Sequence, residues 1–254
     1  MSLPSGSLAY REEGAGPCLV LIHGIPGSSR DFRWLTPCLP GLRVVRPDLP
    51  GFGDTPVRTG VGDRPEHAAR IVLGMMDALE LERVVAVGHS FGGSTVAELS
   101  RLAPDRVSGC GFVASVGPRA HRGFRKMSRP QWRGLSMALR VPPLRWLLLP
   151  KLRDAYRRAG FPRGLADDAL LRTVHRGAAL SFPEHGVALA EVGVSSLVAW
   201  ALDDPLVEAG ISEAVAAAVP EGPRLSFDSG GHNLQKSMAV ELGGALVDYV
   251  HAVW

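Results

Sequence analysis

The strongest chemical signal in the sequence is the segment GHSFGG at 88–93, where one glycine lies two residues before Ser90 and another lies two residues after it. A strand is predicted before this segment and a helix after it, so Ser90 should lie on a sharp turn with an exposed hydroxyl. The N–H groups at the start of the helix would also stabilise an oxyanion. The pattern favours a serine nucleophile, and the alternative is a glycine turn that only caps the helix.

Two other positions could activate this serine, because a serine hydroxyl alone is a weak nucleophile. The acids Asp203 and Asp204 follow one predicted strand, and His232 follows the next. All three should lie at the same edge of the sheet as Ser90. The chain order serine, aspartate, histidine is that of hydrolases whose nucleophile sits on a strand-to-helix turn.

Other side chains compete for these roles. Asp228 precedes His232 by four residues, and His89 is adjacent to Ser90 but should point away from it. His23 belongs to a predicted turn. The remaining histidines are expected on the surface or in the inserted segment described below: His67, His121, His175, His185 and His251.

Strand and helix patterns alternate along most of the chain. Strands are predicted at 8–11, 18–22, 42–45, 83–87, 110–114, 196–201 and 224–227, and those at 18–22 and 42–45 are short apolar runs that end at turn residues. Helices are predicted at 28–39, 65–80, from the glycine segment to about 103, 211–219 and 236–253. The alternation indicates an α/β fold with a mostly parallel sheet flanked by helices. It stops after Gly117, where three helices are predicted at 130–139, 144–159 and 167–180.

The charge is divided unevenly along the chain. The net charge is +3, but residues 119–176 hold 15 Lys and Arg against three acids, which gives +12 and leaves −9 on the remainder. This division predicts a basic helical insertion in an acidic body. We expect a core at 1–117 and 191–254, interrupted by an inserted helical cap at 118–190.

Four blocks in this order resemble the α/β-hydrolase family, specifically its cap-bearing branch of esterases, C–C bond hydrolases and haloalkane or epoxide hydrolases. The blocks are HGIPG at 23–27, DLPGFG at 48–53, GHSFGG at 88–93, and the pair DDP at 203–205 with GH at 231–232. The resemblance covers nearly the whole chain and implies the α/β-hydrolase fold. Its pattern selects Asp204 over Asp203 as the acid of the triad.

The sequence departs from the family in a few places. Ala201 stands where a glycine is common, the segment at 233–236 lacks an acidic residue often found after the histidine, and the N-terminal hairpin looks shortened. Relatives that cleave carbon–halogen bonds or epoxides use aspartate as nucleophile, so Ser90 argues against both activities.

The N–H groups of two residues are predicted to form the oxyanion hole. Phe91 follows the nucleophile at the helix start. In the turn after the strand at 18–22, Pro26 has no N–H to donate, so Ile25 is the natural second donor. The glycine-containing turn at 48–55 is expected to maintain the fold.

The inserted helices carry apolar residues that could lie over Ser90, and we predict substrate contacts from Trp132, Met137 and Trp146. Their many arginines are typical of a solvated surface. The alternatives are attraction of acidic substrates and contact with anionic lipid surfaces.

Length and composition restrict the function classes. With 254 residues, 46% of them hydrophobic, and no long apolar run, the chain is typical of one globular domain without membrane insertion. Three cysteines without ligand spacing predict reduced, buried thiols and no metal. No nucleic-acid motif and no signal peptide are found, so we expect a cytoplasmic monomer or homodimer.

These features predict a cofactor-free serine hydrolase with the triad Ser90, Asp204 and His232, acting as a carboxylic ester hydrolase on small to medium apolar esters. A C–C bond or lactone hydrolase with the same triad is the first alternative. A ligand-binding protein without catalytic activity on the same scaffold is the second.

Overall fold

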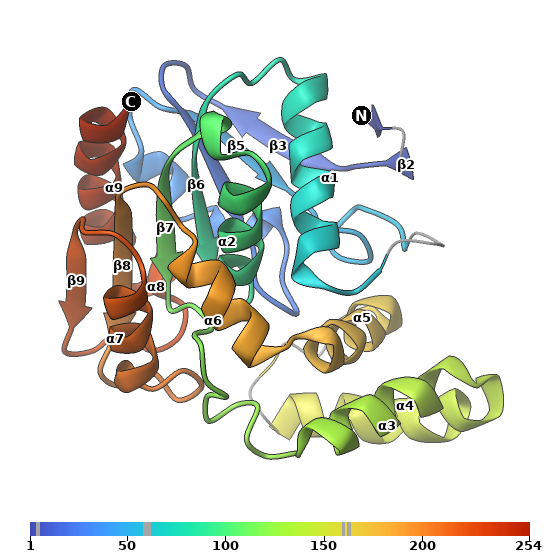
Figure 1. The fold of residues 1–254 in the computed structure, drawn as a ribbon. Coiled ribbons are helices and arrows are strands. Elements are labelled where there is room, and N and C mark those ends of the chain that lie inside the picture. The colour runs from blue at the N-terminus through green and yellow to red at the C-terminus, as the bar shows by residue number, and fades with distance from the viewer. Residues whose placement is uncertain (4–5, 58–61, 159–160, 162–163) are drawn as a thin grey trace.

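The computed structural model describes residues 1–3, 6–57, 62–158, 161 and 164–254. Among these residues, seven strands form one sheet in the order β3-β5-β4-β6-β7-β8-β9 (Figure 1). Neighbouring strands are parallel, except that β3 pairs antiparallel with β5. The strands are β3 (Tyr10–Glu13), β4 (Cys18–Ile22), β5 (Arg43–Pro47), β6 (Val84–His89), β7 (Val107–Val113), β8 (Ser196–Ala201) and β9 (Arg224–Phe227), and a separate ribbon pairs β1 (Ser2–Leu3) with β2 (Gly6–Ser7).

Helices cover both faces of this sheet, which confirms the predicted α/β fold. They are α1 (Pro65–Ala78), α2 (Gly92–Leu102), α3 (Arg129–Arg140), α4 (Pro142–Arg158), α5 (Asp167–Ala179), α6 (Phe182–Ala190), α7 (Ala209–Ala218), α8 (Leu234–Ser237) and α9 (Ala239–Val253). The described residues also include three 3-10 helices: η1 (Ser29–Phe32), η2 (Thr36–Cys38) and η3 (Pro104–Arg106).

The central strand β4 shows how the sequence divides the core into two layers. Its side chains alternate between the faces of the sheet. Leu19 and Leu21 pack with α9 on one face, and Val20 and Ile22 pack with α1 and α2 on the other. All four are fully buried. A strand that is buried on both faces needs a continuous apolar run, and that is the pattern found at 18–22.

Several sequence predictions differ from the structure. The helix predicted at 28–39 is wrong: η1 and η2 replace it because Pro37 has no N–H to continue a helix. The helix predicted at 236–253 is divided into α8 and α9. The pattern predicts no helix at 182–190, where α6 lies. Cys18 and Cys110 are buried free thiols as expected, whereas Cys38 is half-buried.

The segment between β7 and β8 contains α3, α4, α5 and α6, which we call the inserted helices. Leu139, Leu171 and Val174 form a small apolar cluster between α3, α4 and α5, separate from the two clusters along the sheet. In Figure 1 the α3–α4 pair lies farther from the sheet than α5 does. Within the described ranges, no helix is both long and apolar enough to cross a membrane.

The pKa of His185 tests whether α6 packs closely against the end of β7. Its ring is buried and its Nε2 lies 3.2 Å from the carbonyl oxygen of Val116. Burial lowers the pKa of His185 from 6.5 to about 4. Between these two values the unfolded chain binds a proton that the folded chain does not, so the free energy of unfolding falls as the pH is lowered through this window.

The variant His185→Gln should remove this contribution. We expect the slope of unfolding free energy against pH to decrease by close to one proton, about 1.4 kcal/mol per pH unit, between the two pKa values. Urea unfolding at several pH values measures it. The control is His251→Gln, which replaces an exposed histidine on α9 and should keep the wild-type slope. Identical slopes for all three proteins would contradict the buried, neutral ring.

Candidate active site

Ser90 occupies a strained turn between β6 and α2. Its φ of +53° lies in the left-handed region that residues other than glycine rarely adopt. Close packing fixes the turn: a Cβ on Gly88 would lie 2.4 Å from the carbonyl carbon of Gly92, and a Cβ on Gly92 would lie 2.2 Å from the carbonyl oxygen of Ile22. Only glycine fits at these two positions, so the strand, the helix and the neighbouring β4 meet directly at Ser90.

Three side chains from different strand ends form one hydrogen-bonded chain. The Oγ of Ser90 lies 2.9 Å from Nε2 of His232, and Nδ1 of His232 donates to Oδ2 of Asp204 at 2.8 Å. The second oxygen of Asp204 accepts from the N–H groups of Leu206 and Val207 at 2.7 and 2.9 Å. The structure thus brings together the three residues predicted as a triad.

The neighbouring acid has a different position. Asp203 is exposed, and its Oδ1 accepts from the N–H of Gly231 at 2.7 Å, which holds the turn before His232. Asp228 is also exposed. Of the three acids considered from the sequence, Asp204 is the one that contacts the imidazole.

Asp204 remains ionised although it is buried. Burial alone would raise the pKa of its carboxyl group. The hydrogen bond and charge of His232, together with the N–H groups of Val207 and Leu206, outweigh that effect and hold the pKa below its usual value. A carboxylate in this state orients the imidazole and stabilises its protonated form.

Two free N–H groups lie beside Ser90, on the residues predicted to form an oxyanion hole. Neither Ile25 nor Phe91 donates its backbone N–H to any other described residue. The turn that carries Ile25 lies against the serine, since a Cβ on Gly24 would be 2.9 Å from the Cβ of Ser90. These donors are available to a ligand at Ser90.

His89 has a supporting position that the sequence did not reveal. Its Nε2 donates to the carbonyl oxygen of His232 at 2.8 Å, and its ring centre lies 4.9 Å from that of His232. Burial lowers the pKa of His89 to about 3, so its ring is neutral. His89 therefore holds the backbone of His232 and does not contact the hydroxyl of Ser90. His23 is buried as well, and its Nε2 accepts from the N–H of Leu49.

An apolar cluster adjoins the two free N–H groups. Phe91, Val116 and Leu180 are buried in it, and three half-buried residues pack against them: Ile25, Phe124 and Phe182. The rings of Phe124 and Phe182 meet edge to face with their centres 5.5 Å apart. Because Ile25 and Phe91 belong to both features, this cluster could form a wall for the apolar part of a ligand.

Of the three residues predicted to contact substrate, only Trp132 lies near the apolar cluster. The ring of Trp132 packs on Phe124, with 5.3 Å between the ring centres. The structure does not bring the other two to the site, because Met137 is 69% exposed and Trp146 is 81% exposed. Helical periodicity identified α3 and α4 as amphipathic but could not show which apolar positions face the sheet.

His121, in the segment that leads from β7 to α3, contacts the turn that carries Asp204. It is buried, and its Nδ1 donates to the carbonyl oxygen of Leu206 at 2.8 Å. Glu208 on the same turn accepts from the N–H of Arg122 at 2.8 Å and from the guanidinium of Arg125 at 2.5 Å. The start of the insertion is therefore fastened to the turn that positions Asp204.

Arg176 on α5 is a buried cation that the sequence analysis counted only as part of the basic insertion. It is 3% exposed, and its Nε has no hydrogen-bond partner among the described residues. Its guanidinium lies 5.3 Å from the ring centre of Phe52, which packs on the ring of His23 beside Gly24. Burial lowers the pKa of Arg176 to about 10, so the group is charged at neutral pH.

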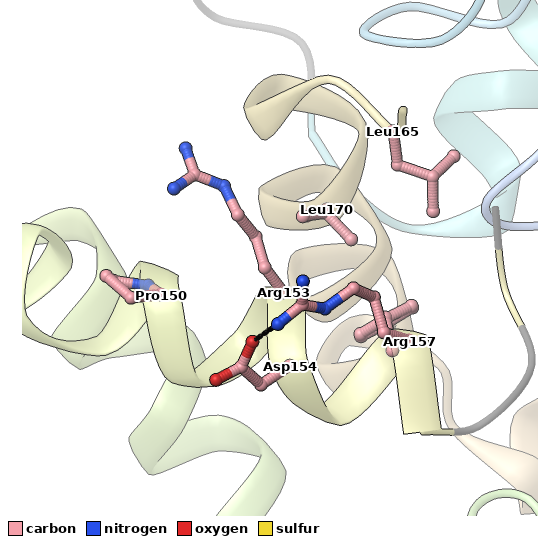
Figure 2. Close-up of a pocket in the computed structure, with 7 residues that line it drawn as sticks. Pro150, Arg153, Asp154, Arg157, Leu165 and Leu170 are labelled. Atoms are coloured by element: carbon pink, nitrogen blue, oxygen red, sulfur yellow. Dashed lines mark hydrogen bonds and ion pairs between the residues drawn. The ribbon is translucent and has the colours of Figure 1, made fainter. Parts of the chain in front are cut away.

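Two cavities lie away from Ser90. One, of about 260 Å³, is formed between α4 and α5, where Arg157 pairs with Asp154 beside Arg153 and Leu170 (Figure 2). The other, of about 290 Å³, lies between α1, α2 and α6. No triad residue lines either cavity. In the part of the chain that the structure describes, no three His, Cys, Asp or Glu side chains are grouped to hold a metal ion.

A mostly parallel sheet with a serine on a strained strand-to-helix turn, facing an aspartate–histidine pair, defines the α/β-hydrolase class of folds. The family profile described as alpha/beta hydrolase fold matches residues 17–145. The chain belongs to this family, which confirms the resemblance drawn from the four sequence blocks.

Similar proteins include several hydrolases. The chain is 26% identical to a 2-hydroxy-6-oxononadienedioate/2-hydroxy-6-oxononatrienedioate hydrolase of Cupriavidus pinatubonensis, over 94% of this chain and 89% of the relative. A thermophilic esterase from Thermogutta terrifontis superimposes with a TM-score of 0.75 at 21% identity, over 97% of this chain and 93% of the esterase. A meta-cleavage product hydrolase from Pseudomonas fluorescens IP01 gives 0.71 at 21% identity, over 96% and 94%. The two structures show the shared fold.

The distinct contacts of the two neighbouring acids give a direct test. In Asp204→Asn the imidazole loses its charged partner, so we expect the low-field proton resonance of His232 Nδ1–H to shift upfield or disappear in the NMR spectrum. We also expect a loss of about 1–3 kcal/mol in unfolding free energy, because a buried, multiply hydrogen-bonded group is altered. Asp203→Asn is the matched control and should keep the resonance. The opposite ranking would assign the contact to Asp203.

Proposed function

We propose that the protein is a serine hydrolase that cleaves carboxylic esters of small to medium size through an acyl-enzyme. The observation that carries this proposal is the continuous hydrogen-bonded chain from Ser90 through His232 to Asp204, with the serine on a strained turn beside two free N–H groups. Burial alone would raise the pKa of Asp204, but its hydrogen bonds and the charge of His232 outweigh burial and keep it ionised, so that it can stabilise a protonated imidazole.

The proposed reaction follows from these contacts. The Oγ of Ser90 attacks the ester carbonyl while Nε2 of His232 takes its proton, and the carbonyl oxygen becomes an oxyanion that accepts from the N–H groups of Ile25 and Phe91. The imidazolium then donates its proton to the leaving alkoxide. Water, deprotonated by His232, attacks the acyl-enzyme and restores Ser90.

We further propose that residues 118–190 act as a cap over a core formed by 1–117 and 191–254. Two features support this assignment. The inserted helices have a small apolar cluster of their own, and the segment 118–190 contributes Phe124, Leu180 and Phe182 to the apolar cluster beside Phe91. An apolar wall at this place favours acyl groups without charge. Trp132, packed on Phe124, would extend it.

The first test is the variant Ser90→Ala on short-chain aryl esters. We expect turnover to fall by about a thousandfold or more, because both attack and acyl transfer require the hydroxyl. A fluorophosphonate probe should label the wild type and not the variant. Ser108→Ala, which alters a serine on β7 hydrogen-bonded to Val84, is the control and should keep activity and labelling. An unlabelled wild type would favour the non-catalytic ligand-binding alternative.

A second candidate function is hydrolysis of a C–C bond next to a ketone, with the same triad. Two observations favour it. The relatives that match over most of the chain are hydrolases named for dioate substrates, which carry carboxylates. Arg176 is buried and charged and forms no ion pair with a described residue, although the charge of Asp63 acts on it from a longer distance. A buried unpaired cation is costly, and an anionic substrate group would compensate it.

The variant Arg176→Gln separates the two candidates. For a vinylogous 1,5-diketone that bears a carboxylate, we expect kcat/KM to fall by about 10- to 100-fold, since a hydrogen bond to a charged group is lost. The value for a neutral aryl ester should change little. Arg145→Gln, which alters an exposed arginine, is the control. Equal losses on both substrates would mean that Arg176 serves the fold instead.

Cytoplasmic location and a monomeric or homodimeric state stay predictions from the sequence.

A further inference from the structure

The turn between α3 and α4 exposes a concentration of large apolar side chains. Met137 is 69% exposed, Trp146 81% and Leu147 53%, and Val141 and Leu144 are exposed by 45% and 43%. We call these five residues the tip. In Figure 1 the α3–α4 pair lies beyond α5 as seen from the sheet, so the tip belongs to the outer part of the inserted helices. Apolar side chains gathered at one exposed place are typical of a binding surface.

The arrangement of the tip limits what can cover it. Residues 142–147 are consecutive in α4 and all exposed. At 100° per residue they point in every direction around the helix axis. A flat protein partner would cover one side of such a convex end and leave the others in water. A soft medium that surrounds the helix end can cover all of them.

Positive charge surrounds the tip. Residues 129–158 contain eight Lys and Arg and a single acid, Asp154, which gives a net charge of +7. Arg129, Arg133, Arg145 and Lys151 form no ion pair with any described residue. One face of α3 carries Arg129, Arg133 and Met137 at a spacing of four residues. Positive side chains therefore lie on the same face as the apolar tip residue Met137.

We propose that the tip inserts among the headgroups of an anionic lipid surface. Trp146 and its apolar neighbours would enter the boundary between headgroups and acyl chains, and the unpaired cations would contact lipid phosphates. Attachment of this kind is peripheral and reversible, which agrees with the finding that no described helix could span a bilayer.

A second copy of the chain is a less suitable partner for this surface. Two tips brought together would place two helix pairs of +7 side by side, and like charges in contact oppose association. An anionic membrane offers the opposite charge. The proposed attachment does not depend on the hydrolytic reaction, so it should be retained in Ser90→Ala.

Co-sedimentation with vesicles tests the proposal. The 254-residue chain is mixed with vesicles of phosphatidylcholine alone, or with vesicles that contain equal amounts of phosphatidylcholine and phosphatidylglycerol. We expect binding to the mixed vesicles, weaker binding to the neutral ones, and loss of binding as salt is raised. The double variant Trp146→Ser, Leu147→Ser should bind at least about tenfold more weakly, because one Leu-sized side chain removed from water accounts for that factor.

Two matched variants make the result specific. Trp34→Ser alters an exposed tryptophan that also lies beside basic groups, Arg33 and Lys236, but on the body of the protein, and it should bind like the wild type. Arg145→Gln with Lys151→Gln should weaken binding to the mixed vesicles only. Circular dichroism and thermal unfolding check that each variant is folded.

Three outcomes would overturn the proposal. The wild type could fail to bind mixed vesicles at low salt, or the tip variant could bind as well as the control. In the third, the tip variant would change a dimer to a monomer in sedimentation equilibrium without changing vesicle binding, which would assign the tip to an interface between copies.

Discussion

The direct contact of β6, α2 and β4 at Ser90 is the constraint on which the rest of the site depends. Gly88 and Gly92 allow these three backbones to meet, and the meeting holds Ser90 at a φ of +53°. In the sheet order, β8 and β9 lie two and three strands away from β6. Their following turns must therefore reach back across the sheet edge. The hydrogen bond from His89 to the carbonyl oxygen of His232 ties the longer of these turns to the strand that carries the serine.

The turn that carries Asp204 is constrained a second time, because it also binds the segment that leads into α3. The N–H of Leu206 donates to Asp204, and the carbonyl oxygen of Leu206 accepts from His121. A displacement of the segment that carries His121 would therefore also displace the carboxylate of Asp204. Burial makes this coupling strong, since an unsatisfied polar group in such a place costs about 1–3 kcal/mol. The position of the insertion and the orientation of His232 are parts of one network.

Much of the fold could be predicted from local sequence, and the failures have physical causes. The strand at 196–201 matches β8, which is buried throughout, because a buried parallel strand needs a short apolar run between turn residues. The strand at 224–227 matches β9, a half-buried edge strand. Pro37 overrides the helical pattern at 28–39. Contacts across the fold left no local signal. Phe124 and Phe182 pack in the cluster beside Phe91, whereas Met137 and Trp146, which were expected near Ser90, are exposed. Periodicity identifies the apolar face of a helix but not which residues cover that face.

The inserted segment contains positive charge in two different environments, one buried and one exposed. Arg176 points inward, is buried against Phe52 and has a lowered pKa, whereas Arg129, Arg133 and Arg145 point outward around the tip. Dissolved salt screens exposed charges within about 10 Å at 0.1 M ionic strength, but screens buried ones much less. The two features should therefore respond differently to salt. The proposed recognition of an anionic substrate by Arg176 should therefore persist at an ionic strength that already prevents the proposed attachment to a lipid surface. The net charge of the insertion alone describes neither proposed role.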